Sequence, residues 1–217
     1  MATYEVLHDE GMNFVKITLD NERVRAEAGA LCYMVGNITM EARIPSFGQM
    51  VRAALSKESL VRPTYAGTGE LYLESSYGGF YVFNLQDEAW LLDSGIYWAS
   101  DITVQLSARQ LNPWLALRAG EGFWYFQTKV TGSGQVVLTA PGAVEEMTID
   151  HDRLVVDGNY VIARTEGVSF RLKRVTRSFF GSFIAGEKVA HVYEGVGKVL
   201  ISSVPYWRYA LSQQAKS

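Results

Sequence analysis

The heptapeptide G-S-G-Q-V-V-L, residues 132–138, has two relatives elsewhere in the chain. G-T-G-E-L-Y-L begins at Gly67 and G-V-G-K-V-L-I begins at Gly195, so the copies start 65 and 63 residues apart (132 − 67 and 195 − 132). A nearly constant period of this length is typical of an internally repeated fold. Each copy predicts one turn and one strand, because glycine permits a tight reversal and the residues after it favour a sheet.

Strand-ending glycines keep the same period. R-V-R-A-E-A-G ends at Gly29, A-W-L-L-D-S-G at Gly95 and R-L-V-V-D-G at Gly158, 66 and 63 residues apart. Two strand-like segments joined by a turn follow each glycine, and this pattern throughout the chain predicts an all-β fold. The turns are expected at 36–37, 100–101 and 166–167, and alternation predicts that Ile102, Val104 and Leu106, and likewise Val168, Phe170 and Leu172, share one face.

A short amphipathic helix is expected at the equivalent place in each unit. In S-F-G-Q-M-V-R-A-A-L-S-K, residues 46–57, apolar residues recur at helical spacing after a capping box. In L-N-P-W-L-A-L-R, residues 111–118, Asn112 is the predicted N-cap, and in R-S-F-F-G-S-F-I-A-G, residues 177–186, the phenylalanines group on one side. Each helix leads to a polar corner that carries a glutamate: Glu58, Glu121 and Glu187.

These landmarks predict a single triplicated β domain over residues 1–217. Its approximate units are 1–64, 65–129 and 130–192. Nothing before Gly11 matches the Gly-x-Gly strand, whereas the strand at 193–204 has no following strands of its own. We therefore expect this last strand to complete the first unit, either within the chain or in a neighbouring chain, since a free apolar edge is an aggregation hazard.

Composition narrows the functional classes. The 217 residues carry 20 Lys and Arg against 23 Asp and Glu, with both signs mixed along the chain, so no clustered basic surface for nucleic acid is expected. A single cysteine, Cys32, excludes an intramolecular disulfide and fits a reducing compartment. The acidic first residues do not resemble a secretion signal, and no apolar run approaches the ~18 residues of a membrane span. We expect a cytoplasmic protein.

Reactive groups are scattered. His8, His151 and His191 lack the short spacings of a metal site, and Cys32 is expected to be a buried, inert thiol. The three corner glutamates are a possible acid cluster, but a role in binding backbone N–H groups at the corners is favoured. No catalytic motif is present. We expect no catalytic, cofactor-binding or metal-binding residues, no cofactor and no enzymatic activity.

One basic run is followed by aromatic residues, a combination that can rest on an anionic membrane surface. A strand with outward Arg171 and Lys173, followed by core phenylalanines, is the favoured interpretation. The basic residues are Arg171, Lys173, Arg174 and Arg177, and the phenylalanines are Phe179, Phe180 and Phe183.

Three longer segments resemble the altered-inheritance-of-mitochondria protein 24 family. They are E-A-G-A-L-C-Y-M-V-G-N-I at 27–38, A-G-E-G-F-W-Y-F-Q-T-K-V-T-G-S-G-Q-V-V-L at 119–138 and L-V-V-D-G-N-Y-V-I-A-R-T-E-G-V-S-F at 154–170. The resemblance, here to bacterial members, implies a fold similar to the tryptophan RNA-binding attenuation protein (TRAP-like). That fold would be three tandem double-stranded β-helix modules with a pseudo-threefold repeat, and such modules associate into rings. Three chains would then make a nine-module trimer.

The resemblance supplies no catalytic residue, and the attenuation protein's basic RNA-contact motif has no counterpart here. The leading hypothesis is a non-enzymatic scaffold or interaction protein, a homotrimeric ring with a protein or membrane-surface partner and no nucleic acid. The alternative is a small-molecule or carbohydrate-binding β module. An enzyme comes third, and a β-trefoil is the second choice of fold, because a period above 60 residues fits it poorly.

Overall fold

The computed structural model describes residues 1–41, 62–76, 78–110, 126–157, 160–173 and 190–204. The three expected helices and the corner glutamates Glu58, Glu121 and Glu187 lie outside these ranges. So do Arg174, Arg177 and the phenylalanines of the basic run. The described ranges contain strands and no helix, which confirms an all-β fold.

Within these ranges, fourteen strands form two seven-stranded sheets in which all pairs are antiparallel. One sheet has the order β3-β4-β2-β7-β10-β5, with β1 paired to β2, and the other has the order β11-β14-β12-β6-β9-β8, with β13 paired to β14. The strands are β1 Thr3–Asp9, β2 Met12–Ala26, β3 Leu31–Glu41, β4 Thr64–Leu73, β5 Phe80–Gln86, β6 Trp90–Leu92, β7 Tyr97–Asp101, β8 Gln105–Gln110, β9 Phe126–Thr131, β10 Ser133–Thr139, β11 Val144–Asp157, β12 Val161–Thr165, β13 Val168–Lys173 and β14 Ala190–Ser202.

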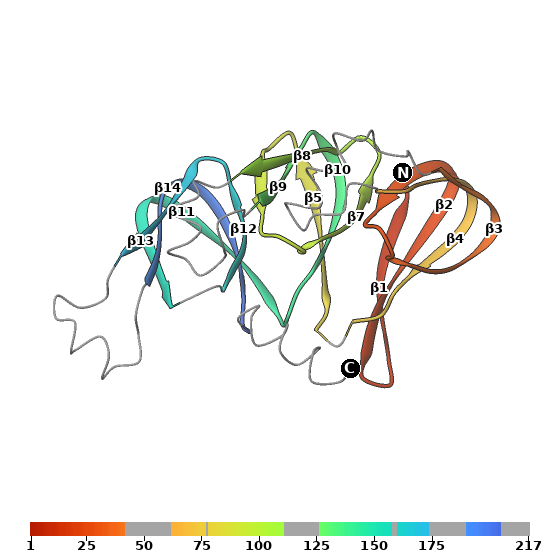
Figure 1. Ribbon diagram of the computed structural model, residues 1–217, viewed down its shortest axis with the longest axis horizontal. Coiled ribbons are helices and arrows are strands. Elements are labelled where there is room, and N and C mark those ends of the chain that lie inside the picture. The colour runs from red at the N-terminus through yellow and green to blue at the C-terminus, as the bar shows by residue number, and fades with distance from the viewer. Residues whose placement is uncertain (42–61, 77, 111–125, 158–159, 174–189, 205–217) are drawn as a thin grey trace.

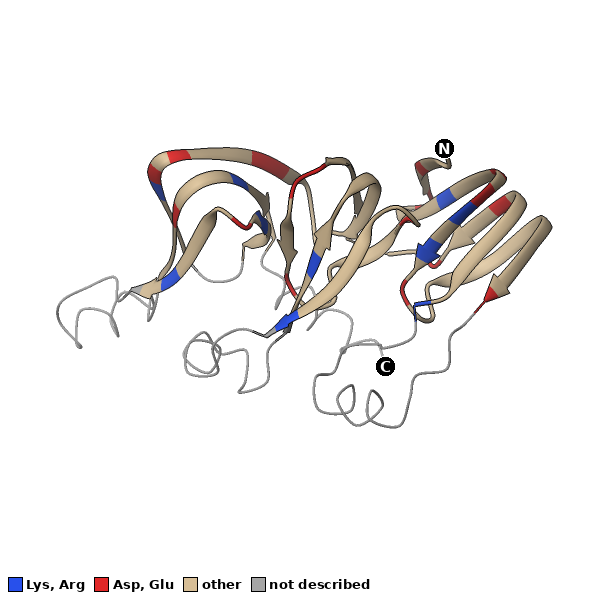
Figure 2. Cartoon of the chain, turned by 90° about the horizontal axis from the view of Figure 1, so that it is seen from above, with Lys and Arg blue, Asp and Glu red and all other residues tan. Residues whose placement is uncertain are grey.

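The strands follow one another along an elongated molecule. Strand β3 lies at one end, and β11, β13 and β14 lie at the other (Figure 1). Three hydrophobic clusters occupy this length, and they contain Ile17 and Leu71, then Trp90 and Leu138, then Val168 and Val199 among their buried members. Basic and acidic residues are interspersed along the strands (Figure 2).

The three Gly-x-Gly sequences occupy equivalent surroundings, as the repeat predicts. Their six glycines have φ between 95° and 151°, a region that L side chains rarely adopt. The first glycine of each pair packs against a carbonyl oxygen, and a Cβ on Gly132 would lie 2.9 Å from that oxygen while one on Gly67 or Gly195 would overlap it. The oxygens belong to Asn37, Thr103 and Gly167, in chain order.

The expected turn at these glycines is wrong in two copies. Gly67 and Gly69 lie inside β4, and Gly195 and Gly197 lie inside β14. The backbone bends there without leaving the ladder, because the partner strands β2 and β11 shift register opposite each pair and absorb the bend.

The paired segments after Gly29, Gly95 and Gly158 also need correction. Only the turn at 166–167 is confirmed, between β12 and β13. In the first unit β3 runs through 36–37 without interruption, and in the second the turn follows Asp101, because Ser100 and Asp101 pair with β2. Val104 is buried as expected, but Ile102 lies in this turn and is 36% exposed.

The last strand does not complete the first unit of its own chain. Strand β14 pairs with β11, β12 and β13, and no pairing joins it to β1–β4 within the described ranges. Strand β4 already supplies a Gly-x-Gly strand to β2 and β3 through pairs such as Ile38 with Gly67. The prediction is wrong for a single chain because each Gly-x-Gly strand pairs with strands that precede it in the sequence.

Candidate functional site: an exposed edge at each end of the chain

Two short β-pairings join successive parts of the chain, and we call them the first and second seams. The first seam pairs Val24–Ala26 of β2 with residues 99–101 of β7, with Arg25 opposite Ser100. The second seam pairs residues 90–92 of β6 with residues 163–165 of β12, with Leu91 opposite Arg164. Each contributes three antiparallel pairs.

The seams share one register. Within its own unit, Val24 pairs with Tyr65, and Trp90 pairs with Val130. Tyr65 and Val130 each lie two residues before the first glycine of a Gly-x-Gly sequence. A further backbone bond repeats as well, from the N–H of Glu27 to the Trp98 carbonyl at 2.7 Å and from Asp93 to Ile162 at 3.0 Å. The two seams are therefore copies of one interface.

Each seam also contains one arginine, half-buried Arg25 in the first and buried Arg164 in the second, but the two come from opposite strands. Arg25 comes from the earlier unit and donates to the carbonyl oxygen of Val104 at 3.3 Å. Arg164 comes from the later unit and donates to the equivalent carbonyl oxygen, that of Val168. Burial lowers the pKa of Arg164, because desolvation disfavours the charged form. The arginine and its small or apolar partner have exchanged places while the bond to the turn is retained.

The third unit presents the first half of such a seam without a partner strand. Leu154 pairs with Tyr193, two residues before Gly195, so Leu154 corresponds to Val24 and Trp90. Val155 then corresponds to Leu91. Leu91 is 0% exposed, whereas Val155 is 49% exposed, because no described strand covers this edge of β11.

The first unit presents the second half. Met34 of β3 pairs with Leu71, as Ser100 pairs with Val136 and Arg164 with Val199 in the other units. Strand β3 is the edge of its sheet, and Tyr33, Met34 and Val35 are 51%, 41% and 58% exposed. The matching residues of β7, Ala99, Ser100 and Asp101, are 0%, 0% and 6% exposed.

The molecule therefore ends in two apolar half-seams that lie far apart at its two ends (Figure 1). We define the β11 half-seam as residues 154–156 and the β3 half-seam as residues 33–35. Extending the register of the internal seams would place Leu154 opposite Val35, Val155 opposite Met34 and Val156 opposite Tyr33.

The residues considered from sequence as reactive groups do not converge. His8 is exposed and bonded to Asn13, and His151 is exposed in the β11 bulge at φ 54°, with Nε2 3.9 Å from the Asp150 carboxylate. His191 is buried, with its ring edge against Phe170. Within the described ranges no group of three His, Cys, Asp or Glu is arranged to hold a metal ion.

Cys32 was expected to be buried, and this is wrong. The thiol is exposed, because β3 is an edge strand with little packed over it. Arg171 points outward as expected, 73% exposed and 3.9 Å from the Glu194 carboxylate, while Phe170 packs on Tyr193.

The half-seams were missed from sequence, although a signal for them exists. Met34 lies five residues after Gly29, as Ser100 lies five after Gly95, and Arg164 lies six after Gly158 because the third copy is one residue longer. An apolar residue at a position that is polar in both other copies indicates a different neighbour.

The comparisons with known proteins fit this architecture. The family model described as mitochondrial biogenesis AIM24 matches residues 4–204. The chain belongs to this family. A crystal structure of a protein from Streptococcus pyogenes is similar to this AIM24 family member, with a TM-score of 0.74, 20% sequence identity and 100% coverage of both chains, which shows a shared fold. No curated protein matches the AIM24 family member. The described ranges contain no helix that could span a membrane.

Proposed function

We propose that the protein is a non-enzymatic scaffold that assembles head to tail into a homotrimeric ring, built from double-stranded β-helix (TRAP-like) modules. The observation that carries the proposal is the match between the β3 and β11 half-seams and the two halves of the internal seams. A second copy of the chain supplies the complementary strand to each half-seam with three backbone-paired residues. Three chains of three units would give the closed ring expected from the family resemblance.

Edge strands that are apolar and unpaired are normally protected, because they template association. Here the apolar positions coincide with the buried centre of an existing interface. Heterologous contacts of this kind build rings when the rotation closes, and closure leaves no free edge. A ring also presents several copies of the same surface, which suits a scaffold for a protein or membrane-surface partner. The interspersed charge supports a partner other than nucleic acid (Figure 2).

The register is tested by cross-linking between chains. In a Cys32→Ser background, Val35→Cys with Leu154→Cys should form disulfides under mild oxidation and give dimer and trimer bands on a denaturing gel, because paired strands hold their Cα atoms within disulfide range. Met40→Cys with Leu154→Cys is the matched control, since Met40 is a similarly exposed β3 residue five positions away. Equal cross-linking of both pairs would contradict the register, and a monomeric wild type at micromolar concentration would contradict the ring.

A cytoplasmic location belongs to the same proposal. The exposed Cys32 thiol fits it, because thiols stay reduced in that compartment. Expression of a tagged full-length chain followed by fractionation tests it, and recovery with an oxidising compartment would contradict it.

The alternative of a small-molecule-binding β module has one observation in its favour, a polar groove beside the first seam. This groove is formed by a single chain.

A further inference from the structure

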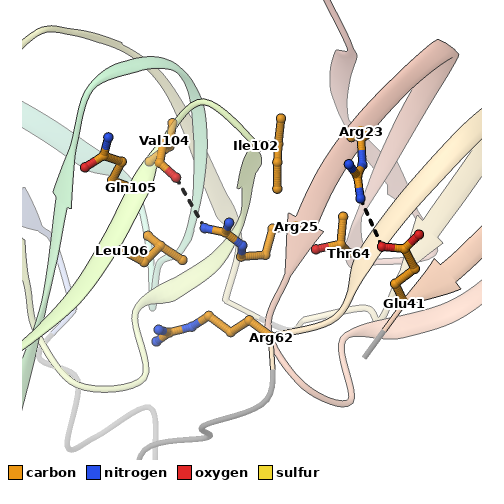
Figure 3. Close-up of a pocket in the computed structure, with 9 residues that line it drawn as sticks. All are labelled: Arg23, Arg25, Glu41, Arg62, Thr64, Ile102, Val104, Gln105 and Leu106. Atoms are coloured by element: carbon orange, nitrogen blue, oxygen red, sulfur yellow. Dashed lines mark hydrogen bonds and ion pairs between the residues drawn. The ribbon is translucent and has the colours of Figure 1, made fainter. Parts of the chain in front are cut away.

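A groove of about 620 Å³ opens beside the first seam, between the β2–β4 side and the turn from β7 to β8. Three arginines reach it from one side, Arg23, Arg25 and Arg62 (Figure 3). Ile102 and Leu106 contribute to an apolar wall on the other. The groove thus combines concentrated positive charge with a hydrophobic surface.

Two of the arginines already hold carboxylates. Arg23 lies 2.9 Å from the Glu41 carboxylate, and Arg62 lies 2.9 Å from that of Glu27. Arg62 also stacks on a ring, with its guanidinium carbon 4.9 Å from the ring centroid of Tyr97. These contacts hold the two guanidinium groups at the sides of the groove and pair each of them with a carboxylate.

Arg25 differs from both. It is half-buried, its hydrogen bond goes to the neutral carbonyl oxygen of Val104 at 3.3 Å, and no ion pair joins it to a carboxylate in the described part of the chain. Four of the five N–H donors of a guanidinium remain after that bond. A partly buried charge of this kind is stabilised by an anion that bonds to it.

The second seam carries an anion where the first seam has an isoleucine, and the cations that hold it come from β8 and β9, at positions other than that of Arg25. Glu166 lies in the β12–β13 turn, at the position that corresponds to Ile102 in the β7–β8 turn. The correspondence follows from the seam register, in which Thr165 pairs with Trp90 as Asp101 pairs with Val24, and Glu166 and Ile102 are the next residues. The Glu166 carboxylate accepts from Lys129 Nζ at 2.7 Å and from Arg109 Nη1 at 3.2 Å.

That carboxylate is well stabilised. The hydrogen bond from Lys129 holds the pKa of Glu166 below its ordinary value, with a further contribution from Arg109. A different groove of about 600 Å³, on the β11–β14 side of the second seam, has Glu88, Asp150, Glu166 and Lys198 as its charged lining. The first seam has isoleucine in place of the internal anion.

We infer that the first-seam groove is a binding site for a small organic oxyanion, a carboxylate or a phosphate, whose anionic group takes the place that Glu166 occupies in the second seam. The donors of Arg25 would bond to it directly, with Arg23 and Arg62 beside it. The planar guanidinium fork matches the oxygens of carboxylate and phosphate. Ile102 and Leu106 would contact a short apolar part of the ligand, which favours an organic anion over a bare inorganic one.

The experiment is calorimetric titration of the full chain with inorganic phosphate, glycerol phosphate and butyrate, at fixed ionic strength. Arg25→Gln removes the unpaired charge but keeps a donor for the Val104 carbonyl. Ile102→Glu installs the carboxylate that the second seam carries, at a position that is 36% exposed. Arg109→Gln is the matched control, an exposed arginine whose partner is Glu166.

We expect wild type and Arg109→Gln to bind an organic probe with the same affinity. Arg25→Gln and Ile102→Glu should bind it about ten- to hundred-fold more weakly, the loss of one charge-assisted hydrogen-bonded contact. Preference for glycerol phosphate or for butyrate assigns the class of ligand. Absence of binding by wild type, or undiminished binding by either groove variant, overturns the inference. Because every variant is compared at the same oligomeric state, measured by light scattering, these outcomes are independent of the ring.

Discussion

The substitution Val155→Asp tests the ring at the centre of one half-seam. Val155 is 49% exposed in the single chain and would be buried opposite Met34, as Leu91 is buried in the second seam. Burying the exposed half of a valine side chain is worth about 1 kcal/mol, and placing a carboxylate there without a partner costs at least ~2 kcal/mol more. The loss of about 3 kcal/mol per seam weakens each chain-to-chain contact by roughly two powers of ten.

The assay is light scattering coupled to size exclusion over a dilution series. Wild type should have the mass of a trimer at micromolar concentration, and Val155→Asp that of a monomer whose far-UV circular dichroism spectrum is unchanged. Val196→Asp is the control, because Val196 is 50% exposed and its counterparts in the other Gly-x-Gly sequences are polar, Thr68 and Ser133. An unchanged mass for Val155→Asp, or equal dissociation of both variants, would refute the reasoning.

Three further outcomes are expected. Gly195→Ala should lower the free energy of unfolding by about 2–4 kcal/mol in denaturant titrations, because its Cβ would overlap a carbonyl oxygen. Gly11 has φ 79° but open space around it, so Gly11→Ala should lower the free energy of unfolding by only about 1 kcal/mol. Burial raises the pKa of Tyr97 to about 12, so this tyrosine ionises at lower pH in the unfolded chain than in the folded one. The free energy of unfolding should therefore fall by up to ~1.4 kcal/mol per pH unit from pH ~10 and level off above pH ~12. Tyr97→Phe should reduce this fall when unfolding is measured as a function of pH. Ser100→Arg should destabilise the first seam by about 2–3 kcal/mol, because it places a buried cation beside half-buried Arg25. Adding Arg25→Leu should recover part of the loss, because the pair then reproduces the second seam. A double variant no more stable than Ser100→Arg would contradict the exchange of arginines.

Local chemistry explains what could be predicted of the fold. The spacing of Gly67, Gly132 and Gly195 reports a backbone requirement at a single residue, so the repeat is readable without coordinates. Alternation in 168–172 likewise reports a strand with one covered face. The expected turns at the first and last Gly-x-Gly failed for the same reason, since a glycine at positive φ serves a bend inside a strand as well as a reversal of the chain, and only the pairing partner distinguishes them.

The candidate sites could not be predicted in the same way. Exposure of Val155 and Met34 depends on which strands lie beside β11 and β3, and these pairings join residues far apart in the chain. The first-seam groove brings Arg25 and Arg62 together with Ile102 of a different unit. Neither arginine carries a local mark that separates it from a solvated surface cation.

The sequence by itself determined the all-β fold, the period of the repeat, its family and the glycines that the backbone requires, because each is a property of short segments. Tertiary structure decided which copies of the repeat are buried against each other, which edges are left open and which groups surround Arg25. Those outcomes depend on strand pairing across units, which gives similar segments different neighbours. Whether an apolar or charged side chain belongs to an interface or a binding site depends on those neighbours.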